Sequence, residues 1–320
     1  MRFAPLFQAC LLLAALCGWT GAATADAALA ASPAQGETFA LQLASNGAQP
    51  LDANTGSVQF IGTATVIIRF KGFTILTDPN FLDKSEHVKL GYGLTSERKT
   101  NPAISFEDLP PIDLVVLSHF HDDHFDKKVQ ERLKRSTPII STKEAGERLK
   151  RMGFTHTFGL STWDRVDVAK GASRLRITAT PGRHGPAAVA VLLPKTMGSV
   201  LEFGANTALP DYRIYISGDT LVHDDIGAIP QRFPNIDLAL LHLGGTRLLG
   251  AVKVTMDGKD GVRMMQILRP RKTMPIHFND YDVFESPLEE FAGEVKAAAL
   301  EKDVVYLSHG QTYEFTPVQR

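Results

Sequence analysis

Four potential metal ligands fall within one six-residue stretch of this sequence. The stretch reads His-Phe-His-Asp-Asp-His and contributes His119, His121, Asp123 and His124. Imidazoles and carboxylates are costly to bury without partners, so packing alone does not explain the cluster. Together they are ligands that suit zinc and its transition-metal neighbours. The spacing therefore predicts a metal site.

Further candidates lie downstream, each where a hydrophobic run gives way to a polar or Gly-rich turn. Side chains at i and i+2 of an extended segment point the same way, so the first two histidines of the cluster can reach one ion. The candidates divide into two sets of three: His119, His121 and His184 for one ion, and Asp123, His124 and His277 for the other. Asp219 could bridge the two ions.

Such a site could catalyse hydrolysis. Each ion would keep an open or water-filled position. A hydroxide held between two metals is nucleophilic at neutral pH, because metals lower the pKa of water from 15.7 to about 7. Asp123 could also orient this hydroxide. We therefore predict a dinuclear metal-dependent hydrolase of an ester, lactone or phosphodiester, with two Zn²⁺ ions and with Mn²⁺ or Fe as alternatives.

The elements that must position these residues are mostly strands. Hydrophobic runs and turn residues predict strands at 58–61, 63–70, 73–77, 112–117, 138–140, 163–168, 175–180, 189–193, 199–203, 212–216, 236–241, 272–276 and 304–307. Helices are expected at 127–133, with Asp126 as N-cap, and at 143–150, 261–268 and 288–300. Residues 82–110 look like a long irregular loop. This pattern indicates an α/β protein with sheets between helix layers.

The N-terminal segment predicts export. Residues 1–25 combine Arg2, an apolar stretch and Ala23-Thr24-Ala25 before Asp26, which is typical of a cleaved signal peptide. Both cysteines, Cys10 and Cys17, lie inside it, so the mature chain would offer no thiol ligand. We expect a linker at 26–55, with room for one edge strand, a hydrolase domain at 56–320, and a periplasmic or secreted location.

Charge and hydropathy indicate which classes of partner the protein can bind. The net charge of −1 lacks the basic footprint of a nucleic-acid binder, and no later stretch is long and apolar enough for a stable membrane span after signal cleavage. We expect a small-molecule or lipid-like substrate, whereas the oligomeric state is not readable from the sequence.

The whole constellation resembles the metallo-β-lactamase superfamily. The match to its His-x-His-x-Asp-His signature is complete, and His184, a Ser-Gly-Asp at Asp219 and His277 follow in the family's order. The resemblance implies a four-layer αββα sandwich with its metals at one edge between the sheets. The runs 61–66 and 76–79 resemble the branch of ascorbate-6-phosphate lactonase-like proteins and N-acyl-phosphatidylethanolamine phospholipase D. That branch commonly has Gly-His where this chain has Gly62-Thr63, so Thr63 could support the metal shell only through its hydroxyl.

Several neighbouring residues could support the site or contact the substrate. Asp78 is expected to orient a metal-bound histidine, and His242 either lines the pocket or is structural. The loop 82–110, with Tyr92 and Arg98, could cover the site, and residues 279–281 could touch substrate. Two other functions stay open: a mononuclear iron oxygenase acting on a sulfur substrate, and a noncatalytic metal-binding protein.

Overall fold

The computed structural model describes residues 36–45, 54–91, 93–204, 209–248 and 250–317. The predicted signal peptide lies outside the described residues, as do residues 26–35 and 46–53 of the predicted linker. Within the described ranges, no helix combines the length and apolar character needed to cross a bilayer.

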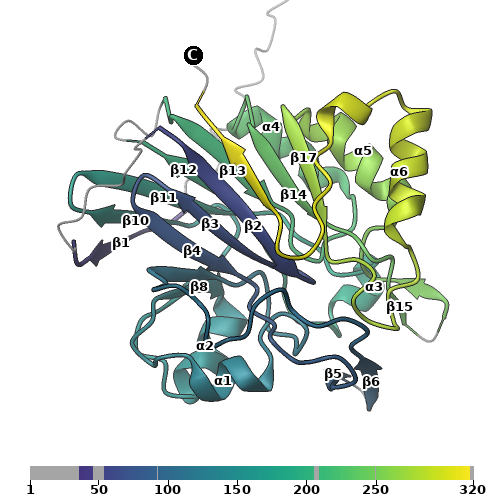
Figure 1. Cartoon of the computed structure of the whole chain (residues 1–320), viewed down its shortest axis with the longest axis horizontal. Coiled ribbons are helices and arrows are strands. Elements are labelled where there is room, and N and C mark those ends of the chain that lie inside the picture. Colours follow the sequence, from purple (N-terminus) through teal and green to yellow (C-terminus); the bar gives the residue numbers. More distant parts are fainter. Residues whose placement is uncertain (1–35, 46–53, 92, 205–208, 249, 318–320) are drawn as a thin grey trace, which may run out of the picture. The chain divides into compact units, whose positions relative to one another are not determined.

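Two seven-stranded sheets carry the structure (Figure 1). The order of the first sheet is β1 (Thr38–Leu43), β10 (Arg165–Lys170), β11 (Ser173–Thr180), β12 (Gly198–Phe203), β13 (Tyr212–Ile216), β14 (Leu238–His242) and β17 (Lys272–Ile276). The order of the second is β18 (Thr312–Phe315), β2 (Gly56–Gly62), β3 (Thr65–Phe70), β4 (Phe73–Thr77), β7 (Leu114–Val116), β8 (Ile139–Thr142) and β9 (Thr157–Leu160). Strand β1 is the edge strand for which the predicted linker left room.

Both sheets follow one plan. Strands β2, β3 and β4 form an antiparallel meander, and β7, β8 and β9 extend it with parallel pairs. In the first sheet, β10 to β13 pair antiparallel, and β14 and β17 then add parallel to β13. Parallel strands need crossover connections, and helices supply most of these. The helices are therefore placed on the outer faces.

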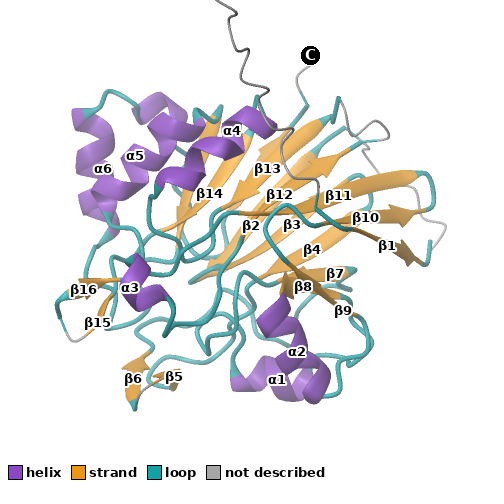
Figure 2. Ribbon diagram, turned by 180° about the vertical axis from the view of Figure 1, so that it is seen from behind, coloured by secondary structure: helices purple, strands orange, loops and turns teal. Residues whose placement is uncertain are grey.

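The helices cover the sheets from outside (Figures 1 and 2). Helices α1 (Lys127–Arg132) and α2 (Lys143–Arg151) flank the second sheet, and α4 (Ala228–Arg232), α5 (Gly258–Leu268) and α6 (Leu288–Ala297) flank the first. Asp126 caps α1 as predicted, because its carboxylate accepts the Val129 N–H at 2.9 Å.

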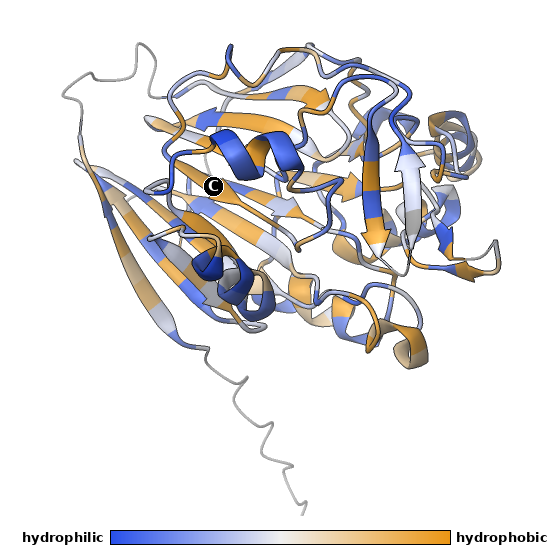
Figure 3. Ribbon diagram, turned by 90° about the horizontal axis from the view of Figure 1, so that it is seen from below, coloured by the Kyte–Doolittle hydropathy of each residue, from blue (hydrophilic) through white to orange (hydrophobic). Residues whose placement is uncertain are grey.

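Three apolar clusters hold the layers together. One fills the space between the sheets, with Phe60 and Ile68 from the second sheet and Ile177 and Leu201 from the first. Another packs the outer face of the first sheet on α5 and α6, and a third packs the second sheet on α1 and α2. In Figure 3, much of the length of the strands has the colour of hydrophobic residues. The predicted four-layer αββα sandwich is confirmed.

Small elements fill the connections. They are two hairpins, β5–β6 (His87–Gly91 and Leu94–Glu97) and β15–β16 (Arg247–Leu248 and Val252–Lys253), the short helix α3 (Ala187–Ala190), and the 3-10 turns η1 (Asp224–Gly227) and η2 (Glu301–Asp303). The hairpin β5–β6 corrects the prediction that residues 82–110 are irregular.

Two strand predictions are wrong. Residues 189–193 do not form a strand. Helix α3 takes up the start of this apolar run, and Val191 and Leu192 are 70% and 61% exposed, so no sheet covers them. Residues 304–307 make only one bridge, between Val304 and Thr273, and the chain instead closes the second sheet with β18.

Strand β18 generates a stability prediction. The Phe315 ring stacks 3.9 Å from the Tyr212 ring of the first sheet and lies 5.2 Å from the Phe70 ring. A Cβ at Gly56 would come within 2.2 Å of Phe315, so the backbone there makes room for this ring. We expect Phe315→Ala to lower the free energy of unfolding by about 3 kcal/mol, because it leaves a cavity between the sheets. Urea denaturation measures the change.

The matched control is Thr312→Ala, an exposed position on the same strand. It should change the unfolding free energy by less than about 0.5 kcal/mol. Equal effects of the two variants would contradict the assigned packing of β18.

Candidate metal centre

Strand direction brings the candidate ligands together. Strands β11 and β13 are both antiparallel to β12, and β14 and β17 are parallel to β13, so these four strands end at one edge of the first sheet. His184 follows β11, Asp219 follows β13 and His277 follows β17. In the second sheet, β7 ends beside β4 and leads into the run from His119 to His124. The two edges meet where His124 Nε2 lies 3.3 Å from Asp219 Oδ2.

One group of ligand atoms is formed by three imidazoles. Atoms of His119, His121 and His184 lie within 4.8 Å of one another, and His119 Nε2 is 3.0 Å from His121 Nδ1. The Val254 carbonyl lies 2.9 Å from His184 Nδ1, so Nδ1 must carry the proton and Nε2 is left to bind a metal. Ser118 Oγ holds the His119 ring in the same way, at 3.0 Å from Nδ1.

A second group adds two carboxylates to two imidazoles. Atoms of Asp123, His124, Asp219 and His277 lie within 4.8 Å of one another. His277 Nε2 is 3.4 Å from Asp123 Oδ2 and 3.8 Å from Asp219 Oδ1. Asp219 Oδ2 also approaches the first group, at 4.0 Å from His119 Nε2. Asp219 thus stands between the two groups, where the sequence placed a bridging carboxylate.

These residues fit a cation. Among the described residues, Asp123 Oδ1, Asp219 Oδ1 and His124 Nε2 are buried and have no hydrogen-bond partner. A buried polar atom without a partner costs about 1–3 kcal/mol, which a coordinated ion removes. Imidazole nitrogens and carboxylate oxygens are the donor set of zinc and related metals.

The electrostatics also favour a cation. Burial and the neighbouring imidazoles hold the pKa of His119 well below its usual range, and burial lowers the pKa of His121 to about 3. Both rings are therefore neutral at pH 7, the form that binds metal. Burial opposes charge on His124 too, but the Asp219, Asp123 and Asp78 carboxylates raise its pKa well above the usual value. A proton thus competes with a metal ion for that ring.

A glycine allows Asp219 to reach this position. Gly218 has φ +60°, and a Cβ there would lie 2.5 Å from the Met197 carbonyl oxygen and 3.0 Å from Ser118 Cβ. A side chain would push the Ser-Gly-Asp turn away from the loop that carries the histidines. The turn therefore needs glycine.

Asp78 supports the second group, as expected. Its Oδ1 accepts the Ser118 N–H at 2.7 Å, and its Oδ2 lies 3.3 Å from His124 Nδ1 and 3.0 Å from His242 Nε2. His242 is fully buried and also lies 3.2 Å from Ser217 Oγ, so it is a structural residue behind the site. Although Asp78, His124 and His242 lie close enough to hold an ion, His124 Nε2 already faces Asp219.

Thr63 acts through its backbone, which the sequence did not suggest. Its carbonyl accepts the His277 N–H at 2.6 Å, and its N–H donates to Asp280 Oδ2. Among the described residues, the buried Thr63 hydroxyl has no hydrogen-bond partner, so support of the metal shell by this hydroxyl stays a prediction. His309 lies 3.2 Å from Asp280 and completes this link. A His beside a Gly was its only sequence signal.

Of the residues expected near substrate, Tyr281 is structural, whereas Asn279 is exposed and its contact with substrate stays a prediction. Tyr281 is buried, and its hydroxyl donates to Asn80 Oδ1 at 3.0 Å. Asn279 Oδ1 accepts the Leu288 N–H at 3.3 Å. Arg98 is fully buried and donates to Asn80, so it covers nothing, and Tyr92 lies outside the described residues.

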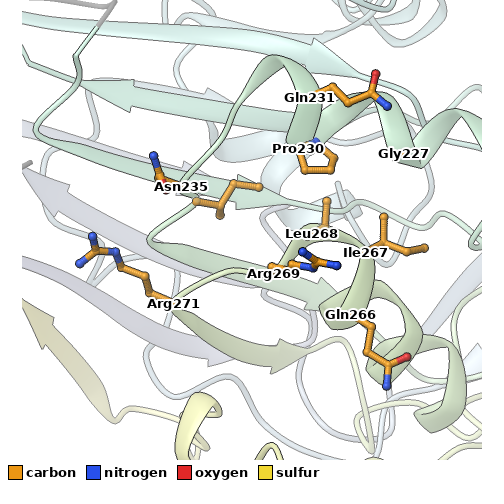
Figure 4. Close-up of a pocket in the computed structure, with 10 residues that line it drawn as sticks. Gly227, Pro230, Gln231, Asn235, Gln266, Ile267, Leu268, Arg269 and Arg271 are labelled. Carbon is orange, nitrogen blue, oxygen red and sulfur yellow. The ribbon is translucent and has the colours of Figure 1, made fainter.

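Cavity volume does not identify the candidate metal centre. A cavity of about 560 Å³ lies between α4 and the C-terminal end of α5, and Figure 4 shows Gln231, Arg269 and Arg271 around it. It shares no residue with either ligand group. The buried atoms without partners, rather than the larger volume, mark the candidate centre.

Asp78 provides a test of this support. Asp78→Asn keeps the shape of the side chain but removes its charge, so it holds His124 less firmly. Loss of such an outer partner typically lowers metal affinity by about 10–100-fold, and we expect a fall in this range. Competition with a chromophoric chelator measures it. The control Asp83→Asn, at a carboxylate that is 66% exposed, should leave metal affinity unchanged. Unchanged affinity in both variants would remove Asp78 from the site.

Comparison with known proteins shows the family of this chain. The model of the beta-lactamase superfamily domain matches residues 74–278, more than half of the chain. A UPF0173 metal-dependent hydrolase of Methanosarcina mazei is 29% identical over 73% of this chain and 94% of its own length. Two solved structures share the fold. A possible metal-dependent hydrolase of Veillonella parvula has a TM-score of 0.70 at 22% identity and covers 82% of this chain and 99% of its own. An isothiocyanate hydrolase from Delia radicum gut bacteria has a TM-score of 0.68 at 21% identity, covering 81% and 99%. The chain therefore belongs to the metallo-β-lactamase superfamily, and it is a metal-dependent hydrolase.

Proposed function

We propose that this protein is an exported dinuclear hydrolase, with zinc as its metal, that cleaves an ester, lactone or phosphodiester. One observation carries the proposal. Two groups of buried ligand atoms lie side by side, and Asp219 stands 3.3 Å from a ring of one and 4.0 Å from a ring of the other. A single ion would leave one of the groups without a cation.

The residues take distinct roles. His119, His121 and His184 would hold one ion, and Asp123, His124 and His277 the other, with Asp219 shared. When bound, the ions would supply activated water at neutral pH and polarise the group under attack. Ser118 and the Val254 carbonyl fix two rings of the first group so that their free nitrogens stay aimed at the ion.

Asp123 is proposed as the catalytic carboxylate. Its Oδ2 faces His277, while Oδ1 is buried and without a hydrogen-bond partner among the described residues. This free oxygen can accept a hydrogen bond from the attacking water and so hold it in line with the substrate. Neighbouring imidazoles lower the Asp123 pKa to about 2 against the opposing effect of burial, so the group stays ionised at pH 7.

The substrate class has to be identified by an activity screen. Esters, lactones and phosphodiesters all place an electrophilic centre next to an oxygen that an ion can polarise. The likeness of fold to an isothiocyanate hydrolase adds isothiocyanates to the panel. Fold alone does not select among these substrates.

Metal content and Asp219 test the proposal together. Elemental analysis of the mature protein, purified from its native host without added metal, should give about two zinc ions per chain. Asp219→Ala should retain at most one, because neither group keeps its shared oxygen. Hydrolysis should fall by more than the ~10–100-fold typical of losing an outer partner. The control Asp225→Ala, whose carboxylate is 79% exposed, should match the unsubstituted protein.

Other outcomes point to the other functions. Full hydrolysis by Asp219→Ala would end the proposal. One iron per chain with oxygen uptake on thiol substrates would favour an oxygenase. Unfolding upon chelation, without turnover of any substrate, would favour a noncatalytic metal-binding protein.

Export has its own test. Small residues before Asp26 and the apolar stretch upstream support cleavage after Ala25. Mass spectrometry of protein from the native host should find a chain that begins at Asp26, and fractionation should recover it outside the cytoplasm. Replacing Ala23 and Ala25 by Leu should block processing, because bulky residues do not fit the cleavage site. An intact N-terminus in the unsubstituted protein would show that the segment is not a cleaved signal.

A further inference from the structure

A cavity of about 240 Å³ borders the candidate metal centre at His121. Its lining comes from β5, the His-rich loop, α2 and the segment after α3: Lys89, Leu90, Gly91, Phe120, His121, Asp122, Arg148, Leu193 and Pro194. The other six candidate ligands are buried, whereas His121 is partly exposed. The cavity therefore lies on the side from which a substrate can approach the metals.

The base of the cavity is apolar and small. Phe120 and Leu193 are buried, with exposed fractions of 4% and 6%, and Leu90 and Pro194 of the same lining are half-buried. The volume is roughly eight times the ~30 Å³ that one water occupies in the liquid. It falls below the ~300–1,000 Å³ usual for a whole ligand. The cavity thus suits one short apolar part of a substrate.

The rim of the cavity is cationic. Lys89 and Arg148 are exposed there, and Asp122 is the one acidic residue of the lining. The Asp122 carboxylate accepts the backbone N–H of Lys89 at 3.3 Å. The Arg148 guanidinium carbon lies 3.9 Å from the Phe120 ring centroid, so a cation–π contact holds the guanidinium against the apolar base. Its edge can then offer two parallel N–H donors to a planar anion.

We propose that this cavity binds a short aliphatic arm of the substrate that ends in a carboxylate. The arm packs on Phe120 and Leu193, its carboxylate pairs with Arg148 and Lys89, and the bond to be cleaved lies beside His121. The proposal deepens the proposed function and rests on it for the reaction. Arg148 and Lys89 are specificity residues, because they contact a part of the substrate remote from the reacting atoms.

Matched acids and esters test the pairing. Glutarate and valerate have five carbons each, but only glutarate has a second carboxylate for the rim. Calorimetry on the metal-loaded mature protein should show tighter binding of glutarate. Arg148→Ala should weaken glutarate binding roughly fivefold to tenfold, as for a partly exposed charged hydrogen bond, and leave valerate unchanged. The Arg148→Lys variant should be intermediate. Arg151→Ala, on the same helix but outside the cavity, is the control.

Hydrolysis of the monoesters p-nitrophenyl glutarate and p-nitrophenyl valerate is measured on the same variants. Arg148→Ala should raise KM for the glutarate ester alone and leave kcat unchanged. Equal binding of the two acids, or equal loss of both in Arg148→Ala, overturns the cavity proposal. Charge-dependent binding without turnover of either ester, or of the wider panel, overturns the proposed function and upholds the cavity. Turnover that does not depend on Arg148 upholds the proposed function and overturns the cavity proposal.

Discussion

The fold is organised around an electrostatic cost. Three carboxylates and five imidazoles (Asp78, Asp123 and Asp219, and His119, His124, His184, His242 and His277) are buried where the edges of the two sheets meet, with His121 at the margin. Charged groups removed from water are costly unless they are paired or bound to a metal. Pairing inside the cluster meets part of the cost, since Asp78 and Asp219 approach several rings. Atoms such as Asp123 Oδ1 remain without partners, and a cation is the species that satisfies them together.

The backbone around this cluster carries strain. Thr63, Asp78, His277 and Asn279 all have positive φ, between 36° and 61°. Residues other than glycine held in such conformations cost of order 1–3 kcal/mol each where the conformation is sparsely populated, and they persist only when surrounding contacts fix them. Two hydrogen bonds fix these turns. The Thr63 carbonyl accepts the His277 N–H, and the Asp78 carboxylate accepts the Ser118 N–H. The three apolar clusters make the sheets rigid enough to hold these turns.

The sequence predicted most of what chemistry requires and less of what packing decides. The spacing of His119 and His121 predicted a shared orientation, and the structure brings their ring nitrogens to 3.0 Å. The sandwich followed from strand patterns and the family resemblance. In contrast, 189–193 looked like a strand because it is apolar, yet Val191 and Leu192 are largely exposed. Strand β18 was missed because its partner β2 lies over 250 residues away in the chain, and a register of that range leaves no local pattern.

The contact of Thr63 with the metal centre does not depend on its side chain. A side chain that ligates or supports a metal cannot be replaced freely, but the Thr63 contact with His277 uses the main-chain carbonyl, which every residue has. The Asp280 carboxylate fixes the Thr63 N–H, and Thr100 and His309 fix Asp280 in turn. The position can therefore change its side chain while the turn keeps its shape. Lys89 and Arg148 are charged and exposed, and they line the cavity beside His121 instead. Under the cavity proposal, a change of substrate selection at this rim would leave the buried ligands unaltered.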